Sequence, residues 1–381
     1  MVRVHVIAPE GFDDPDRPSG GNIYDRRVCA GLADSGWDVR TTAVAGSWPD
    51  CDGDAAADLA RILAAIPDRE AVLIDGLIAS TAAGQLLPHA RRLGLTVLLH
   101  MPLATAVDEH VDGRYGAAAL RSERAVLGAA AGVVVTSDWT RRQVLARFRL
   151  APDRVHIARP GVDRAAARSA GVENAGNRLL CVGAVSPHKG QDLLVDALAG
   201  LSELDWRCTF VGPLDRDPRF VERLLDRIAR LEFGDRVRFT GVLTGAALNR
   251  AFAGAGLLVV PSRSETYGMV VTEALARGIP VVGAAVGGLP EALGRTADGV
   301  RPGRLVTPDD AEALRRALAD WLRDETHRER LRSAALRRRS TLAGWDQTVR
   351  DLAVALTVVQ RDVVRPLRPA VGRDRPAIRQ T

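Results

Sequence analysis

Short apolar runs alternate with stretches of helical length along most of this chain, and this alternation limits the fold more than any other feature. The runs VRVHVIAP, AVLIDGLIA and GVVVTS begin at residues 2, 71 and 132. Such runs are typical of the strands of a parallel sheet whose two faces are both covered by helices. The sequence therefore predicts an α/β fold of the doubly wound kind.

The alternation stops once and then restarts, which predicts two domains. Residues 164–177, RAAARSAGVENAGN, are small and polar, and strand-like runs resume with RLLCVGAVS. We expect one Rossmann-like domain over residues 1–163, a second over residues 175–340, and a helix at about 345–360 that packs back on the first. Doubly wound sheets bind ligands beyond the carboxyl ends of their strands, so the two domains should face an interdomain cleft.

Charge and composition argue against several classes of protein. Residues 361–381 hold six arginines and two aspartates, so they carry +4 of the net charge of +5. The remainder is nearly neutral, which argues against nucleic-acid binding. We expect the tail to be a disordered basic segment, the alternative being weak membrane association through anionic headgroups. The chain shows no signal peptide and no apolar run of the roughly 20 residues that span a bilayer, so we expect a cytoplasmic protein.

The spacing of the usual ligands does not indicate a metal or disulfide site. The four cysteines lie far apart, which argues against a zinc cluster or a disulfide framework and predicts reduced, mostly buried thiols. Asp215 and Asp217 form an Asp-x-Asp pair of the kind that holds a divalent metal elsewhere. They also precede a helix, whose amino end favours carboxylates. We expect the second role and no metal cofactor.

Two turns are candidates for binding an anion at a helix amino terminus. Gly20 and Gly21, in PSGGNIYDRRV, follow the first strand, and Lys189, in VGAVSPHKGQDLL, follows a strand of the second domain. Lys189 is the one lysine among 52 lysines and arginines. A compact ammonium suits a crowded phosphate pocket better than a planar guanidinium. The turns lack the Gly-x-Gly-x-x-Gly pattern of NAD sites, and an ordinary glycine turn and a chance lysine are the alternatives.

The segment VVPSRSETYGMVVTEALARGIPVV places two glutamates near a predicted helix start. Glu265 lies in the loop after a buried strand, and Glu273 lies on a helix that runs from about Met269 to Gly278. A carboxylate one turn into this helix can accept hydrogen bonds from two vicinal hydroxyls. The amides of residues 267–269 would point toward a phosphate. Two glutamates at this spacing are common, so the spacing alone is a weak signal.

In combination, PSGGNIY, VGAVSPHKGQDLLVDAL, FTGVLT and PSRSETYGMVVTEALARGIPVV resemble the motifs of the large retaining glycosyltransferase family four, which has the GT-B fold. This family includes bacterial mannosyltransferases and the sucrose and glycogen synthases. The resemblance covers nearly the whole chain and is most specific over residues 260–291. It implies a nucleotide-sugar donor held mainly by the second domain. It also implies an acceptor, a small molecule, saccharide or lipid, held mainly by the first.

The resemblance implies a role for several side chains. Lys189 would bind the donor pyrophosphate, Glu273 the ribose hydroxyls and Glu265 the sugar ring. His100, which ends TVLLHMP, matches a histidine near the transferred sugar, although by itself it equally fits a hydrogen-bonded core histidine. Backbone contacts to the donor are implied at Gly20, Gly21, Val242, Tyr267, Gly268 and Met269.

One position departs from the family's pattern. The family usually has an arginine after the glycine of the Val-Gly pair, where it joins the lysine on the diphosphate, and this chain has Ala184 there. We predict that Arg263, in PSRSE, supplies the missing charge. The alternative is that donor binding is weaker than in the family or unlike it.

The resemblance implies that the sugar is transferred with retention at the anomeric carbon. No carboxylate is obviously placed behind that carbon, which favours a front-face route in which the leaving pyrophosphate accepts the acceptor's proton. Lys189 and helix amides would stabilise the leaving group, and domain closure would exclude water. The alternatives are a phosphorylase or epimerase of the same fold, and a non-catalytic protein that binds a sugar nucleotide.

Overall fold

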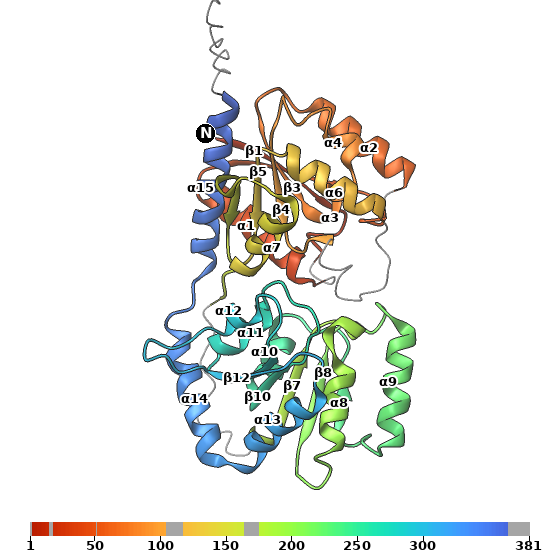
Figure 1. The fold of residues 1–381 in the computed structure, drawn as a ribbon, viewed down its shortest axis with the longest axis vertical. Coiled ribbons are helices and arrows are strands. Elements are labelled where there is room, and N and C mark those ends of the chain that lie inside the picture. Colours follow the sequence, from red (N-terminus) through yellow and green to blue (C-terminus); the bar gives the residue numbers. More distant parts are fainter. Residues whose placement is uncertain (1, 15–17, 51, 104–116, 164–174, 365–381) are drawn as a thin grey trace, which may run out of the picture.

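Two six-stranded sheets, one in each half of the chain, organise the computed structural model, which describes residues 2–14, 18–50, 52–103, 117–163 and 175–364. In Figure 1 the first sheet and its helices form the upper half and the second sheet with its helices the lower half. All strand pairs described in the two sheets are parallel. The prediction of two doubly wound α/β domains is confirmed.

The first sheet is formed by strands β1 (Arg3–Pro9), β2 (Asp38–Val44), β3 (Ala71–Asp75), β4 (Gly94–Leu99), β5 (Gly132–Val135) and β6 (Val155–Ile157). Their order is β2-β1-β3-β4-β5-β6. The connecting helices are α1 (Gly20–Asp34), α2 (Gly53–Ala65), α3 (Gly76–Ala79), α4 (Ala83–Leu86), α6 (Ala117–Ala129) and α7 (Asp138–Phe148), with a 3-10 turn at Pro152–Arg154. Every residue of β3, β4 and β5 is buried, as expected for parallel strands covered on both faces.

The second sheet repeats this plan with strands β7 (Arg178–Val182), β8 (Arg207–Val211), β9 (Val237–Phe239), β10 (Leu257–Val260), β11 (Val281–Ala284) and β12 (Gly303–Val306). Their order is β12-β11-β10-β7-β8-β9. Its helices are α8 (Gln191–Ala199), α9 (Pro218–Arg230), α10 (Gly245–Ala253), α11 (Met269–Ala276), α12 (Leu289–Leu293), α13 (Ala311–Arg323) and α14 (Glu325–Arg339). Short 3-10 turns lie at Ala175–Asn177 and Pro187–Lys189.

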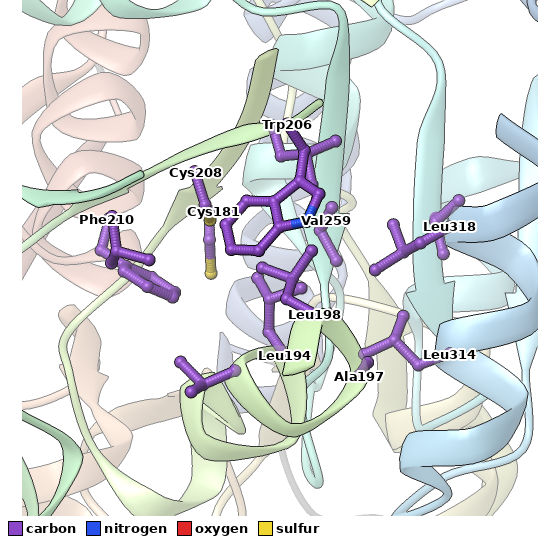
Figure 2. Packing of buried hydrophobic residues seen from close by; sticks show 14 of the residues in the cluster. Cys181, Leu194, Ala197, Leu198, Trp206, Cys208, Phe210, Val259, Leu314 and Leu318 are labelled. Carbon is purple, nitrogen blue, oxygen red and sulfur yellow. The ribbon is translucent and has the colours of Figure 1, made fainter. Parts of the chain in front are cut away.

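The core of the second domain packs around Trp206, which precedes β8 (Figure 2). Leu194 and Leu198 of α8 and Leu314 and Leu318 of α13 enclose the sheet on this side. Cys181 and Cys208 lie in the same cluster on β7 and β8 and are free thiols, as is Cys29 in the first domain. Burial raises the pKa of Cys181 to about 12, which keeps this thiol protonated.

The last helix, α15 (Trp345–Val364), returns to the first domain, where it runs along the sheet in Figure 1. Its side chains Val349, Leu352, Ala355 and Leu356 join a buried cluster with residues of β1 and α1. Gly132 begins β5 directly beneath it, where an added Cβ would lie 2.6 Å from a methyl group of Val359. The helix at about 345–360 thus covers the first sheet.

The limits of the domains stay predictions in part, because residues 164–174 of the connection lie outside the described residues. The basic tail over residues 365–381 lies outside them too. The arginine-rich stretch over residues 309–340 forms two helices, α13 and α14, because Asp324 caps α14 by accepting from His327 N at 3.0 Å. Among the helices described, none is both long and apolar enough to span a membrane.

Candidate functional site

Two adjoining cavities lie between the domains, at the carboxyl ends of the strands. The smaller one, of about 350 Å³, is lined by residues that directly follow β4, β5, β7 and β8, namely His100, Thr136, Gly183 and Gly212. The larger one, of about 1440 Å³, extends along α9. The two share Ser19, Ala184, Lys189, Arg216, Glu265 and Thr266. We call them the small cavity and the large cavity.

The small cavity brings together ten of the eleven residues selected from the sequence. These are Gly20, Gly21, His100, Lys189, Val242, Glu265, Tyr267, Gly268, Met269 and Glu273. Arg263 lines the large cavity instead. The sequence motifs thus mark one place in the molecule, although they are spread over both domains.

Lys189 projects into both cavities from the 3-10 turn Pro187–Lys189. Its Nζ donates to Glu265 Oε2 at 2.7 Å, and the two side chains are 26% and 14% exposed. Gly190 ends the turn with φ of +69°, and a Cβ there would lie 2.2 Å from the carbonyl oxygen of Pro261. Glycine is therefore required for the turn to approach β10 and aim the lysine at the cavity.

The amino terminus of α11 faces the small cavity. Its cap residue, Gly268, has φ of +94° and provides no side-chain acceptor for the first amides of the helix. Those amides and the helix dipole favour an anion at this point. The Tyr267 side chain is buried, and burial raises the pKa of its phenol to about 12, so its hydroxyl stays neutral.

Glu273 lies four residues into α11, on the wall of the small cavity. Burial raises the pKa of its carboxyl to about 7, an effect that the nearby charge of Arg277 partly offsets. Arg277 is engaged through its own side chain, which donates to the Glu273 carbonyl and to Asn249 Oδ1. The Glu273 carboxyl is therefore an enclosed acceptor whose charge changes near neutral pH.

The first domain contributes the start of α1. Ser19 caps this helix by accepting from Asn22 N at 3.0 Å. A Cβ added to Gly20 would lie 3.6 Å from Sδ of Met269, and one added to Gly21 would lie 3.3 Å from Cδ2 of His100. The amino termini of α1 and α11 therefore approach each other across the small cavity, and the glycines keep the approach open.

His100 follows β4 and is held by two aspartates that the sequence reading did not select. Its Nε2 lies 2.8 Å from Oδ1 of Asp25, on α1, and 3.7 Å from Oδ2 of Asp75, at the end of β3. Burial opposes the charged ring, but the charge of Asp25, its hydrogen bond and the charge of Asp75 outweigh burial and raise the pKa of His100. Both aspartates had a signal in the sequence, because Asp75 ends an apolar strand and Asp25 lies one helical turn after Gly21.

Arg263, predicted to compensate for Ala184, is already paired. Its guanidinium donates to both carboxylate oxygens of Asp192, at 2.9 and 2.8 Å, and to Asp309 at 2.8 Å. Arg216, in the loop between β8 and α9, lines both cavities beside Ala184 and Lys189. Within the described residues, Arg216 forms no ion pair. It is a cation near the site that the sequence reading missed.

Asp215 and Asp217 belong to no group of three or more candidate metal ligands among the described residues. Asp217 caps α9 by accepting from Phe220 N at 2.9 Å, which is the role expected from the sequence. Over the same part of the chain, Asp25, Asp75 and His100 form a cluster of this kind. Their carboxylate and imidazole atoms lie within 4.8 Å of one another, as metal ligands would.

The ion pair between Arg159 and Glu291 joins the two domains. Arg159, in the segment after β6, bonds Asp138 at the start of α7 and Glu291 on α12, both at 2.5 Å. Glu291 also accepts from the backbone N of Asp138 at 2.9 Å. The small cavity thus lies between two domains that are in direct contact.

Comparison with known proteins identifies the family. The model described as Glycosyltransferase Family 4 matches residues 2–166, and the model described as Glycosyl transferases group 1 matches residues 163–338. The D-inositol 3-phosphate glycosyltransferase 1 of Catenulispora acidiphila is 32% identical over 309 residues, which cover 75% of this chain and 72% of that protein. The chain belongs to glycosyltransferase family 4.

Other family members match a smaller share of their own length. The D-inositol 3-phosphate glycosyltransferase of Salinispora tropica is 33% identical over 252 residues, covering 60% of this chain and 51% of the relative. The chain thus spans about half to three quarters of the length of these two relatives. The predictions of a family-four glycosyltransferase and of an enzyme of that class are confirmed.

Solved structures confirm the GT-B fold. Sucrose-phosphate synthase from Thermosynechococcus elongatus has a TM-score of 0.81 at 21% identity and covers 95% of this chain and all of its own. The Anabaena protein HepE, solved in complex with UDP-glucose, has a TM-score of 0.72 at 19% identity and covers 94% of this chain and all of its own. These likenesses establish the arrangement of two Rossmann-like domains in this glycosyltransferase.

Proposed function

We propose that this glycosyltransferase binds a nucleoside-diphosphate sugar in the small cavity and transfers its sugar, with retention, to an acceptor that enters through the large cavity. The observation that carries the proposal is the convergence of Lys189, the α11 amino terminus and Glu273 on one cavity. A cation and free helix amides suit a diphosphate, and an enclosed carboxylate suits a pair of hydroxyls. HepE, a protein of the same fold, was solved with UDP-glucose.

The donor would lie along the small cavity with its diphosphate and its sugar next to the junction with the large one. Lys189 and the amides of Tyr267, Gly268 and Met269 would contact phosphate oxygens. Glu273 would accept from the ribose hydroxyls, and the backbone near Val242, a half-exposed residue on the rim, would contact the base. The transferred sugar would then lie near Glu265 and His100. Gly20 and Gly21 would contact the donor from the other domain.

The proposed reaction breaks the bond between the anomeric carbon and the phosphate oxygen and forms a bond to the acceptor oxygen on the same face of the sugar. The proton of the acceptor hydroxyl passes to the departing phosphate oxygen. Lys189 and the α11 amides would stabilise the negative charge that develops on the nucleoside diphosphate. Glu265, which pairs with Lys189, would hold the ammonium in place and contact the sugar. We propose that no metal takes part.

The large cavity is the proposed acceptor site because it adjoins the sugar end of the small one. Met101 and Ser19 of the first domain line its wall, together with arginines of α9. The relatives named D-inositol 3-phosphate glycosyltransferase make inositol phosphates the first acceptors to try. We also expect acceptor choice to depend on loops of the first domain such as ATAVDEHVDGRYG, but residues 104–116 lie outside the described residues. We further propose a cytoplasmic location, with the basic tail as a weak membrane contact.

The proposal is tested by mixing the protein with UDP-, GDP- and ADP-sugars and measuring nucleoside diphosphate release with and without inositol phosphates. We expect release from one donor that increases with an acceptor, and a product with the donor's anomeric configuration by NMR. A phosphorylase would need inorganic phosphate, and an epimerase would convert the donor without releasing nucleoside diphosphate. Binding of a donor without any release would contradict the proposal and support a non-catalytic protein.

A further inference from the structure

Two buried carboxylates lie behind His100, where a ligand in the cavities cannot touch them. The side chains of Asp25 and Asp75 are 4% and 6% exposed, whereas that of His100 is 19% exposed and lines the small cavity. Neither aspartate belongs to the described lining of either cavity. Any effect of Asp25 or Asp75 on a bound ligand therefore passes through the imidazole ring.

The ring of His100 is held on several sides. Tyr24 meets it edge-on, with ring centroids 5.1 Å apart, and is itself fixed by a hydrogen bond from its hydroxyl to the Ala158 carbonyl at 2.9 Å. Gly21 also lies close to the ring, since a Cβ added to it would lie 3.3 Å from Cδ2 of His100. Asp75 is fixed because its Oδ1 accepts from Leu77 N at 2.6 Å. A side chain enclosed in this way keeps one rotamer, which places Nε2 toward the carboxylates.

The charged groups that face His100 are these two aspartates. Tyr24 also faces it, but burial raises the pKa of its phenol well above the ordinary value, so the phenol is neutral. The second domain also brings Lys189, Arg216, Glu265 and Glu273 to the lining of the small cavity. The carboxylates are thus the counter-ions of the ring, and a charged ring in turn compensates a buried carboxylate that would otherwise be unpaired.

The proton balance of the cluster follows from burial and mutual charge. Burial and the charge of Asp25 raise the pKa of Asp75 to about 7, so Asp75 is protonated below that pH. Below that pH, protonated Asp75 adds no negative charge beside the ring. Above pH 7, ionised Asp75 adds a second negative charge beside the ring, which further stabilises the imidazolium.

We propose that Asp25 and Asp75 are positioning residues that keep His100 as an imidazolium, with Nε2 bound to Asp25 and Nδ1–H free to donate to an oxygen of the donor. The proposal rests on the proposed function, since it assumes a donor in the small cavity. Among the described residues none bonds Nδ1, which leaves this atom for a ligand. A neutral ring bound to Asp25 through Nε2–H would present Nδ1 as an acceptor, so the charge decides which oxygens the ring can hold.

The protonation of His100 is measured directly by imidazole ¹⁵N NMR of the full chain between pH 5.5 and 9, with His100→Gln to assign the signal. We expect a midpoint above the ordinary imidazole value of 6.5 in the unmodified protein and a lower midpoint in Asp25→Asn, which lacks the charge of Asp25. Asp75→Asn should match the unmodified protein below pH 7 and lose imidazolium sooner above it, because asparagine resembles protonated Asp75. A midpoint at or below 6.5 in the unmodified protein would overturn the proposal.

The kinetic measurement that corresponds to the NMR titration is the pH dependence of kcat. It is made with the donor that the nucleoside diphosphate release assay identifies. The fall of kcat at high pH should move down in Asp25→Asn by the same interval as the NMR midpoint, with KM changed less than about threefold. Asp34→Asn, an exposed carboxylate on the same helix, is the matched control and should change neither. If the high-pH fall of kcat keeps its position in Asp25→Asn, the proposal is overturned. A change in the His100 titration on adding EDTA would also overturn it, because it would show that Asp25, Asp75 and His100 bind a metal.

The NMR measurement separates this proposal from the proposed function, because it needs no turnover. If no donor is turned over but His100 titrates as described, the proposed function fails while the held imidazolium stands. If Asp25→Asn does not fold, the His100 titration of Asp75→Asn above pH 7 tests the proposal instead. This variant should fold, because asparagine retains the side-chain oxygen that caps α3.

Discussion

Nζ of Lys189 lies 2.7 Å from Oε2 of Glu265, so the cation and the carboxylate at the junction of the two cavities form a partly buried ion pair. The pair is assembled across 76 residues of chain by the approach of the Pro187–Lys189 turn to the end of β10. A diphosphate that binds here would compete with Glu265 for the ammonium. The pair therefore keeps the lysine in position before a donor arrives.

Replacing Glu265 by glutamine should tighten product binding and slow transfer. The amide keeps the shape but removes the competing negative charge, so nucleoside diphosphate should bind a few-fold more tightly by calorimetry. Because Glu265 is also proposed to hold the sugar, kcat should fall by roughly 100-fold, the lower end of the range found for one preorganised polar group. Weaker nucleoside diphosphate binding would show that Glu265 does not compete for Lys189.

Donor binding should depend on the ionisation of Glu273. Its pKa is raised to about 7, so the carboxylate that accepts from ribose hydroxyls forms as the pH rises from 6 to 8. Nucleotide affinity should rise over this interval and should lose that dependence in Glu273→Gln. Equal pH profiles for the two proteins would contradict the role of Glu273.

The raised pKa of Glu273 also makes the free energy of unfolding depend on pH. The native carboxyl holds its proton up to about pH 7, whereas the unfolded one loses it near 4.5, so the native state binds more protons between these values. The contribution of Glu273 to the free energy of unfolding is therefore fully present below pH 4.5 and is lost as the pH rises to 7. Urea unfolding of the unmodified protein should show this decline more strongly than that of Glu273→Gln.

Arg216, more than Arg263, should supply the charge that Ala184 lacks. Arg263 is bound by Asp192 and Asp309, whereas Arg216 lines both cavities without an ion pair among the described residues. Arg216→Ala should lower kcat/KM by about tenfold or more, and Ala184→Arg in that background should restore part of the loss. A larger loss in Arg263→Ala, measured at equal folded fraction, would favour the arginine predicted from the sequence.

The close approach of α1 to His100 should be sensitive to a single methyl group. In Gly21→Ala the new Cβ would lie 3.3 Å from the imidazole, so the ring must shift and transfer should slow by several-fold. Gly53→Ala is the control, because Gly53 also lies in the first turn of a helix and its Cβ would meet nothing within 4 Å. Similar kinetics for the two variants would show that this contact does not limit transfer.

Much of the fold could be predicted because its signals are local. Buried runs such as GVVVTS and the cap at Ser19 each act over a few residues. The division of residues 309–340 into two helices depended on Asp324 serving as a cap, and an aspartate within an arginine-rich helical pattern does not reveal that role.

The site was predicted less completely, because its side-chain partners are distant in sequence. Asp25 and His100 are 75 residues apart and meet only when α1 crosses the end of β4. Arg263 was expected to face a phosphate, but Asp192 and Asp309, from two other segments, reach it in the folded chain. Motifs identified the cavity, whereas the pairing of charges inside it depends on the tertiary structure.

The most direct test of the account is nucleoside diphosphate release by Lys189→Ala, compared with the unmodified protein on the donor it uses. We predict a loss of about 100-fold or more in kcat/KM, because the variant removes the cation from the leaving group. Arg219→Ala, an exposed cation outside both cavities, is the control and should keep full activity. A loss below about threefold in a folded Lys189→Ala protein would contradict the assignment of the donor site.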